Sequence, residues 1–168
     1  QESRGLGDVY KRQVKEGDTI AIGNLACEVM ATPGHTPACV SFRIGNAVFV
    51  GDTMFMPDYG TARADFPGGD ARTLYRSIRR LLALPRETRL FMCHDYLPKE
   101  GRTSFAWETT VGEELDRNIH VNGTVSEDDF VAMRTDRDKK LSAPALLLPS
   151  IPVSYTHLTL PTLDPLYF

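Results

Sequence analysis

The sequence has 168 residues, of which 42% are hydrophobic and 24% charged, and its formal net charge is −3. That length and composition fit one globular domain and are short for two. A net negative charge argues against nucleic acid or a membrane surface as a partner, because both require a basic face. The apolar runs fall far short of the roughly 20 residues that cross a bilayer. Three cysteines without a CxxC spacing favour reduced thiols in a cytoplasmic protein.

Both ends of the sequence resemble translated sequencing adapter. Asp8–Gln13 reads DVYKRQ and Val153–Leu158 reads VSYTHL, which match translations of the two strands of one transposase mosaic end. We therefore expect residues 1–13 and 153–168 to be non-native tails that carry no function. The authentic part, residues 14–152, is then a domain whose gene was cut at both sides.

The first authentic residues predict two β-hairpins. Asp18–Ile22 and Leu25–Met30 flank a Gly-Asn turn at residues 23–24, and Ala38–Ile44 and Ala47–Val50 flank a second one at residues 45–46. Residues 54–69 are rich in Gly, Pro and Asp and predict a long ordered loop. Such a loop inside a compact domain is usually functional.

The second half predicts helices around one further strand. Asp70 is placed to cap a helix that runs to about Leu84. Four arginines lie largely off its apolar face, where a solvated role is simpler than binding substrate carboxylates: Arg72, Arg76, Arg79 and Arg80. Arg89–Cys93 predicts a buried strand. Residues 105–118 and 126–140 predict helices, the latter opened by Ser126, so the order is ββββ, α, β, α, α.

Three polar residues each follow an apolar strand. His35 lies in the segment TPGHTP, Asp52 in GDT and His94 in HDY. If the strands run alike in one sheet, their ends converge at one edge, where ligands are held rigidly. Imidazole and carboxylate suit zinc, iron or manganese, and two histidines with one carboxylate suit non-heme Fe(II). Each residue alone is more often a turn residue, so only the joint pattern indicates a metal site.

These motifs together resemble those of the metallo-β-lactamase superfamily, in their usual order. The stretch Tyr59–Phe66, with the sequence YGTARADF, is similar to the persulfide dioxygenases (sulfur dioxygenases) and to the bacterial β-lactamase hydrolase-like proteins. The resemblance implies an α/β fold. It further implies that the chain is the C-terminal half of an αββα sandwich, with a mixed sheet and covering helices.

The resemblance also implies a metal site. One Fe(II) would be held by His35, Asp52 and a histidine from an upstream motif that this sequence lacks. In relatives with two metals, His94 would bind the second ion and Asp52 would bridge. In the dioxygenases His94 is expected either to contact the metal ligands without binding the metal itself or to bind nothing.

Two further residues match positions near the substrate of that family. Arg63 would lie near the thiol substrate, and the alternative is a structural salt bridge to Asp65 or Asp70. Tyr96 would lie beside the pocket as a catalytic or substrate-binding residue, and the alternative is a half-buried loop aromatic. Cys39 and Cys93 are expected to be core thiols, because each lies in an apolar strand.

The implied activity is oxidation of a thiol persulfide such as glutathione persulfide by O₂ to sulfite and thiol, with the fragment inactive alone. Two alternatives stay open: a di-zinc thioester hydrolase of the glyoxalase II type, and a non-catalytic remnant of the fold. A homodimer and a rhodanese domain fused in the parent gene also stay open.

Overall fold

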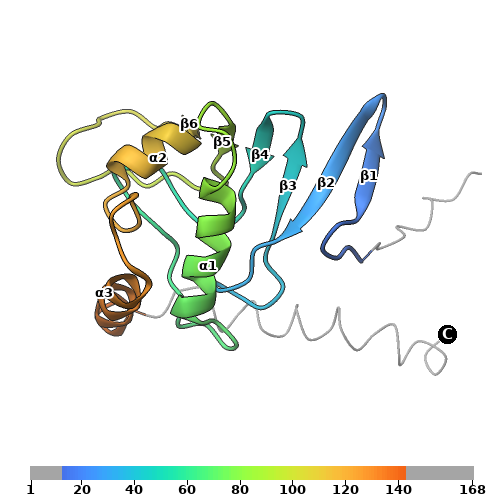
Figure 1. The fold of residues 1–168 in the computed structure, drawn as a ribbon. Helices are drawn as coiled ribbons and strands as arrows, with labels where there is room; N and C mark the ends of the chain where they lie inside the picture. Colours follow the sequence, from blue (N-terminus) through green and yellow to red (C-terminus); the bar gives the residue numbers. More distant parts are fainter. Residues whose placement is uncertain (1–12, 143–168) are drawn as a thin grey trace, which may run out of the picture. The chain divides into compact units, whose positions relative to one another are not determined.

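A computed structural model describes residues 13–142 (Figure 1). The expected non-native tails therefore lie outside the described residues, apart from Gln13. Residues 13–138 belong to one structural unit, and the remaining described residues, 139–142, belong to a second. Within the described ranges, no helix is long and apolar enough to cross a membrane.

Within residues 13–142, six strands form one mixed sheet in the order of the chain. They are β1 (Thr19–Ile22), β2 (Leu25–Ala31), β3 (Val40–Ile44), β4 (Ala47–Phe49), β5 (Arg89–Phe91) and β6 (Glu108–Thr110). All neighbours are antiparallel except β4 and β5, which are parallel. Both predicted hairpins are confirmed. The strands β2, β4 and β5 consequently run in one direction, so their carboxyl ends share an edge of the sheet.

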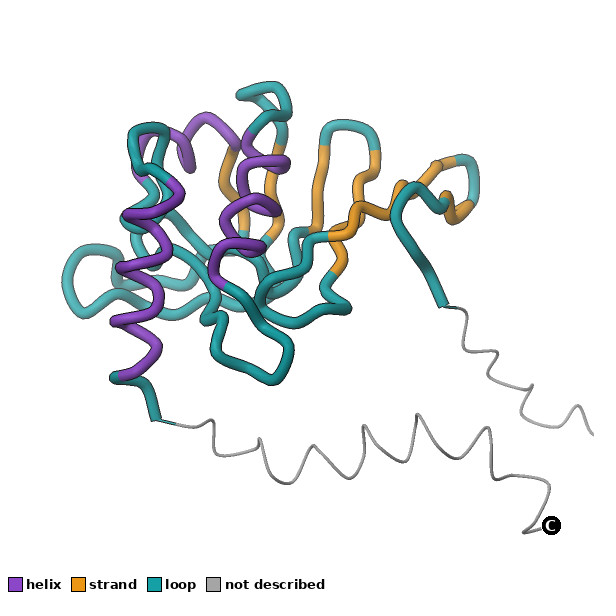
Figure 2. Tube along the Cα trace, turned by 60° about the horizontal axis from the view of Figure 1, so that its bottom comes forward, coloured by secondary structure: helices purple, strands orange, loops and turns teal. Residues whose placement is uncertain are grey.

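Three helices in the described part of the chain accompany this sheet: α1 (Ala71–Leu82), α2 (Val111–Arg117) and α3 (Glu127–Lys139). Helix α1 lies against one face of the sheet, and α3 lies farther from the strands (Figures 1 and 2). Asp70 caps α1 as predicted, because its carboxylate accepts a 2.7 Å hydrogen bond from the Thr73 amide. Ser126 accepts from the Asp129 amide at 3.2 Å in the predicted capping turn before α3.

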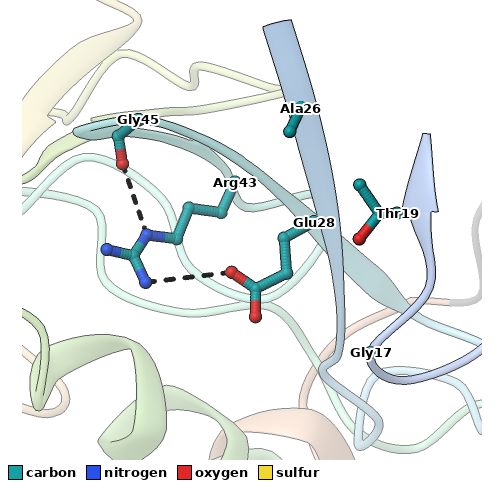
Figure 3. Close-up of a pocket in the computed structure, with 6 residues that line it drawn as sticks. All are labelled: Gly17, Thr19, Ala26, Glu28, Arg43 and Gly45. Carbon is teal, nitrogen blue, oxygen red and sulfur yellow. Dashed lines mark hydrogen bonds and ion pairs between the residues drawn. The ribbon is translucent and has the colours of Figure 1, made fainter. Parts of the chain in front are cut away.

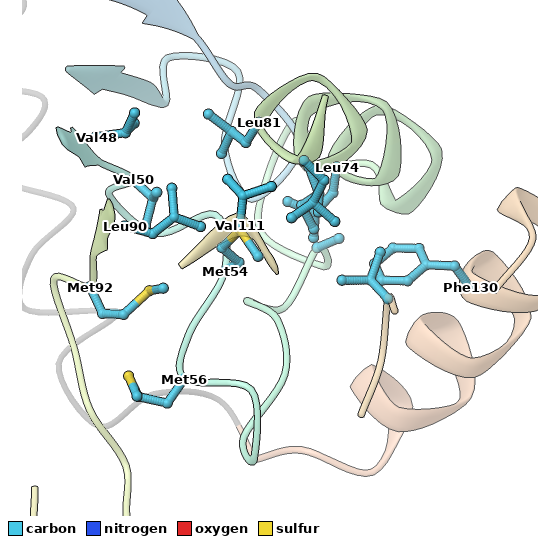
Figure 4. Close-up of a cluster of buried hydrophobic side chains, with 14 residues drawn as sticks. Val48, Val50, Met54, Met56, Leu74, Leu81, Leu90, Met92, Val111 and Phe130 are labelled. Carbon is cyan, nitrogen blue, oxygen red and sulfur yellow. The ribbon is translucent and has the colours of Figure 1, made fainter. Parts of the chain in front are cut away.

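The core lies between α1 and the middle of the sheet (Figure 4). Val48 and Leu90 of β4 and β5 are fully buried, as are Leu74, Ile78 and Leu81 of α1. Burying one such side chain contributes about 1.5–3 kcal/mol. These contacts fix α1, and with it the turn that precedes the helix, against the strands that carry the candidate site.

The prediction of one helix over residues 105–118 is wrong in its first part. Glu108–Thr110 is the edge strand β6, and the helix begins only at Val111. The reason is local: Thr109 and Thr110 are β-branched residues that suit a strand, and Thr110 then forms a capping box with Glu113. Similarly, β5 ends at Phe91, so Cys93 and His94 belong to the following loop.

The other face of the sheet is aromatic. The register places Phe42, Phe49 and Phe91 side by side, on the side opposite Val48 and Leu90. Phe49 and Phe91 stack with ring centroids 5.1 Å apart, and Phe49 remains 44% exposed. The predicted α/β class with a mixed sheet and covering helices is confirmed, with helix α1 on one face of the sheet.

Candidate metal centre

Asp52 and His94 meet at the shared carboxyl edge of β4 and β5. Asp52 follows β4 and His94 follows β5, and because these strands are parallel, both loops emerge on the same side. Asp52 Oδ1 lies 3.3 Å from His94 Nε2. Cys93 Sγ donates a 3.2 Å hydrogen bond to the same oxygen. One donor atom from each of the three residues lies within 4.8 Å of the others, a spacing that one metal ion could span.

His35 stands outside this three-residue group, and its ring is fixed by other contacts. Nδ1 lies 2.7 Å from the Arg63 carbonyl oxygen, and the ring packs edge-on against Phe66 at 4.8 Å. A carbonyl oxygen only accepts, so Nδ1 must carry the proton, and in the neutral ring the lone pair is on Nε2. This is the arrangement in which a metal-binding histidine is held by a backbone carbonyl.

Gly34 brings the His35 turn into close contact with α1. Its φ is +135°, and a Cβ there would lie 2.3 Å from the backbone nitrogen and Cα of Leu74. The Gly34 carbonyl also accepts a 2.8 Å hydrogen bond from the Asp70 amide, just before the helix. Only glycine permits this approach, which determines where His35 leaves the turn.

Helix α3 holds the loop that carries Arg63. Arg134 and Asp138 form a buried ion pair at 2.6 Å, with side chains 2% and 6% exposed. Arg134 Nη1 donates to the Thr61 carbonyl at 3.2 Å, and Asp138 accepts from the Ala64 amide at 2.9 Å. The Arg63 carbonyl that orients His35 therefore lies between two anchored residues.

A second buried cluster supports the same loop. His120 Nδ1 accepts a 3.0 Å hydrogen bond from the Thr61 amide, and burial lowers the pKa of His120 to about 4. Asn118 donates to the Gly60 carbonyl at 3.2 Å and to Glu114 at 2.6 Å. Burial raises the pKa of Glu114 to about 8. His120 is thus a structural residue that keeps a neutral ring, and no sequence motif indicated it.

Aromatic rings form a wall beside His94. Tyr59 and Tyr96 stack with centroids 4.8 Å apart, and Phe55 meets Tyr96 edge-on at 5.3 Å. The Tyr96 ring centroid is 6.0 Å from that of His94, and Tyr96 is 43% exposed. Burial, and secondarily the Asp52 carboxylate, raises the pKa of the Tyr96 phenol. Tyr96 thus lies next to the candidate centre, and its catalytic or substrate-binding role stays a prediction.

The Arg63 side chain forms a structural salt bridge. Its guanidinium binds Asp65 through two contacts of 2.6 Å and lies 5.3 Å from the centroid of the Phe66 ring. Of the two salt-bridge partners considered, Asp65 is the one observed. A role of Arg63 toward a thiol substrate stays a prediction.

The arginines of α1 lie on a largely exposed face, as expected, and they also bind other parts of the protein. Arg72 and Arg76 pair with Glu127 at the start of α3, at 2.7 and 3.0 Å. Arg79 donates to the carbonyls of residues 122 and 125, and Arg80 pairs with Glu16 at 2.7 Å. These contacts hold α1 to its neighbours and leave substrate binding without support.

Cys93 is the residue of this centre that sequence reasoning missed. It is exposed, so its prediction as a core thiol is wrong, because β5 ends two residues earlier. Burial of the thiol group itself and the neighbouring Asp52 raise its pKa to about 12. The sequence signal that could have placed Cys93 at this centre is its position directly before His94. Cys39 is half-buried, with its sulfur 3.1 Å from the Thr36 hydroxyl.

A separate hollow lies on the sheet near β1 and contains none of these residues (Figure 3). Arg43 crosses it, with contacts of 3.3 Å to the Gly45 carbonyl and 3.8 Å to Glu28. Its lining consists of Gly17, Thr19, Ala26, Glu28, Arg43 and Gly45. This hollow is therefore separate from the candidate metal ligands at the sheet edge that carries Asp52.

Comparison with known proteins places the chain in a family. A family model described as the metallo-beta-lactamase superfamily matches residues 3–94. Glyoxylase B2 of Dictyostelium discoideum is 49% identical, covering 88% of this chain and 50% of that protein. The beta-lactamase hydrolase-like protein of Agrobacterium fabrum is also 49% identical, over 88% of this chain and 34% of that protein. The chain thus spans half or less of these two relatives' own lengths.

Similarity extends to persulfide dioxygenases. Human mitochondrial persulfide dioxygenase ETHE1 is 36% identical, over 77% of this chain and 48% of that protein. The crystal structure of ETHE1 from Myxococcus xanthus superposes with a TM-score of 0.73 at 36% identity, covering 84% of this chain and 58% of that one. These likenesses agree with the family and fold expected from the motifs.

Proposed function

Because this chain belongs to the metallo-beta-lactamase superfamily, we propose that it is part of an iron-dependent persulfide dioxygenase. The reaction would convert a small-molecule thiol persulfide, such as glutathione persulfide, with O₂ and water into sulfite and the free thiol. The observation that carries the proposal is His35, whose Nδ1 lies 2.7 Å from the Arg63 carbonyl and leaves Nε2 as the metal-binding nitrogen, together with Asp52 after β4. The likeness to persulfide dioxygenases supports it.

The chemistry of the side chains present suits a metal ion. His35 offers Nε2 because Nδ1 binds the Arg63 carbonyl, and Asp52 offers a carboxylate. Carboxylate and imidazole are ligands that non-heme Fe(II) accepts, and bound iron would supply the oxygen-activating chemistry. The third ligand expected from the family would come from outside this sequence. The iron centre is therefore proposed for the longer protein, and this chain alone should bind iron weakly.

The chain's other residues would shape the substrate pocket. Phe55, Tyr59 and Tyr96 form an aromatic wall that would exclude water beside the reacting sulfur. Arg63 lies next to His35 in this arrangement through its backbone. Its guanidinium, paired with Asp65, would reach substrate only by exchanging that carboxylate for one on the thiol carrier.

The test uses the full-length product of the gene. We expect one bound iron and O₂ consumption with glutathione persulfide, and we expect His35→Ala and Asp52→Ala to lose both. Asp116→Ala, at an exposed surface pair, should retain both. If iron and activity survive in both site variants, the ligand assignment is wrong.

A di-zinc thioester hydrolase is the second candidate. The specific observation in its favour is that Asp52 lies close to both Cys93 and His94, so this carboxylate has donors at hand for a second ion. The likeness to Glyoxylase B2 points the same way. Two metals per protein and cleavage of a glutathione thioester, without O₂ uptake on persulfide, would select this function. A full-length protein that binds no metal would instead select the non-catalytic alternative.

A further inference from the structure

Cys93 contacts the candidate centre through its sulfur. Sγ lies 3.2 Å from Asp52 Oδ1, and His94 Nε2 lies 3.3 Å from that same oxygen. The three donor atoms are all within 4.8 Å of one another. Cys93 is also exposed, so an ion in solution can reach it without disturbing the core.

These separations suit ligands of one ion. Zinc binds thiolate at about 2.3 Å and imidazole or carboxylate at about 2.0–2.2 Å, which places tetrahedral ligands roughly 3–4 Å apart. The contacts of 3.2 and 3.3 Å around Asp52 are already near that range. A donor set of one sulfur, one nitrogen and one oxygen favours Zn²⁺, Fe²⁺ or Co²⁺ over Mg²⁺ or Ca²⁺.

We propose that Cys93 is a metal ligand and that Cys93, Asp52 and His94 together hold one thiophilic divalent cation. The inference rests on the proposed metal centre at Asp52 and His94, but on neither of the two candidate reactions. Binding breaks the S–H bond and forms a sulfur–metal bond, and the proton passes to solvent. The competing explanation is that the thiol only donates a hydrogen bond that orients Asp52.

Cobalt(II) distinguishes these two roles, because a bound thiolate gives a sulfur-to-cobalt charge-transfer absorption in the near ultraviolet. We expect the reduced chain, titrated without oxygen, to bind one Co²⁺ with this absorption and to release a proton. Cys93→Ser should abolish the absorption and weaken Co²⁺ binding at least ten-fold, about the lower bound for removing a ligand's supporting partner. Cys39→Ser, which alters a cysteine outside the cluster, should change neither.

Circular dichroism verifies that each variant is folded. If Cys93→Ser loses no absorption and binds Co²⁺ as tightly as the unaltered chain, the inference is overturned while the metal centre stands. If His94→Ala and Asp52→Ala bind Co²⁺ unchanged, or the unaltered chain binds none, the three-residue site fails as a whole, whereas the iron centre proposed for the longer protein is decided separately by its iron content.

Discussion

Replacing Asp138 with asparagine should destabilise the domain strongly, because it leaves the Arg134 charge buried without its partner. Arg134 is 2% exposed, and burial lowers the pKa of its guanidinium. Removing one member of a buried ion pair costs about 3–5 kcal/mol. Domains of this size have total stabilities of about 5–15 kcal/mol, so the loss is a large fraction of the whole.

Urea unfolding followed by circular dichroism measures this effect. With slopes of about 1–3 kcal/mol per molar urea, the midpoint should fall by at least about 1 M. Asp128→Asn is the matched control, since Asp128 pairs with Arg72 on the surface and its side chain is 85% exposed. Such pairs contribute about 0–1 kcal/mol. Equal midpoint shifts in the two variants would refute the reasoning.

Three other changes test separate features. Gly34→Ala should destabilise the domain and weaken metal binding at His35, because the new Cβ meets the Leu74 backbone at 2.3 Å; unchanged unfolding and metal titrations would count against the close approach. Burial raises the pKa of Glu114 to about 8, so its protonated form favours the folded state. This contribution to stability is complete below the unfolded pKa of 4.5 and is lost as the pH rises to 8, so between pH 6.5 and 8 the unaltered chain should lose up to about 2 kcal/mol of stability relative to Glu114→Gln. Parallel stability curves for the two proteins would exclude this. Thr110→Ala removes the cap of α2 and should cost about 1 kcal/mol in urea unfolding, whereas no loss would show that the capping box is dispensable.

Local sequence signals predicted most of the elements. The two Gly-Asn turns with β-prone flanks define the hairpins, and Asp70 marks the start of α1. The strand β6 was not predicted because three residues are too few to show the alternation typical of a strand, and the apolar residues before it fit a helical spacing. Strand order and the parallel β4–β5 pair have no local signature, because they arise from packing of α1 across both strands.

Some features of the candidate site likewise have a sequence signal, and others do not. Asp52 and His94 were predicted to converge, and they lie 3.3 Å apart. His35 was predicted at the same edge, but its hydrogen bond to the Arg63 carbonyl, 28 positions away in the chain, has no sequence signature. The exposure of Cys93 depends on where β5 ends, which composition alone did not reveal.

The hydrogen bonds from α3 to the segment around Arg63 have a consequence for the order in which the protein folds. Asp138 and Arg134 contact residues 74 and 73 positions earlier in the chain, so the ribosome must deliver the whole of α3 before the Arg63 segment can settle. Contacts so distant in sequence require a costly loop closure, so we expect them to form late in folding. We therefore expect the ring of His35 to reach its final orientation only after this stretch is synthesised. A His35 ring already held by the Arg63 carbonyl in stalled chains ending before residue 127 would contradict this order.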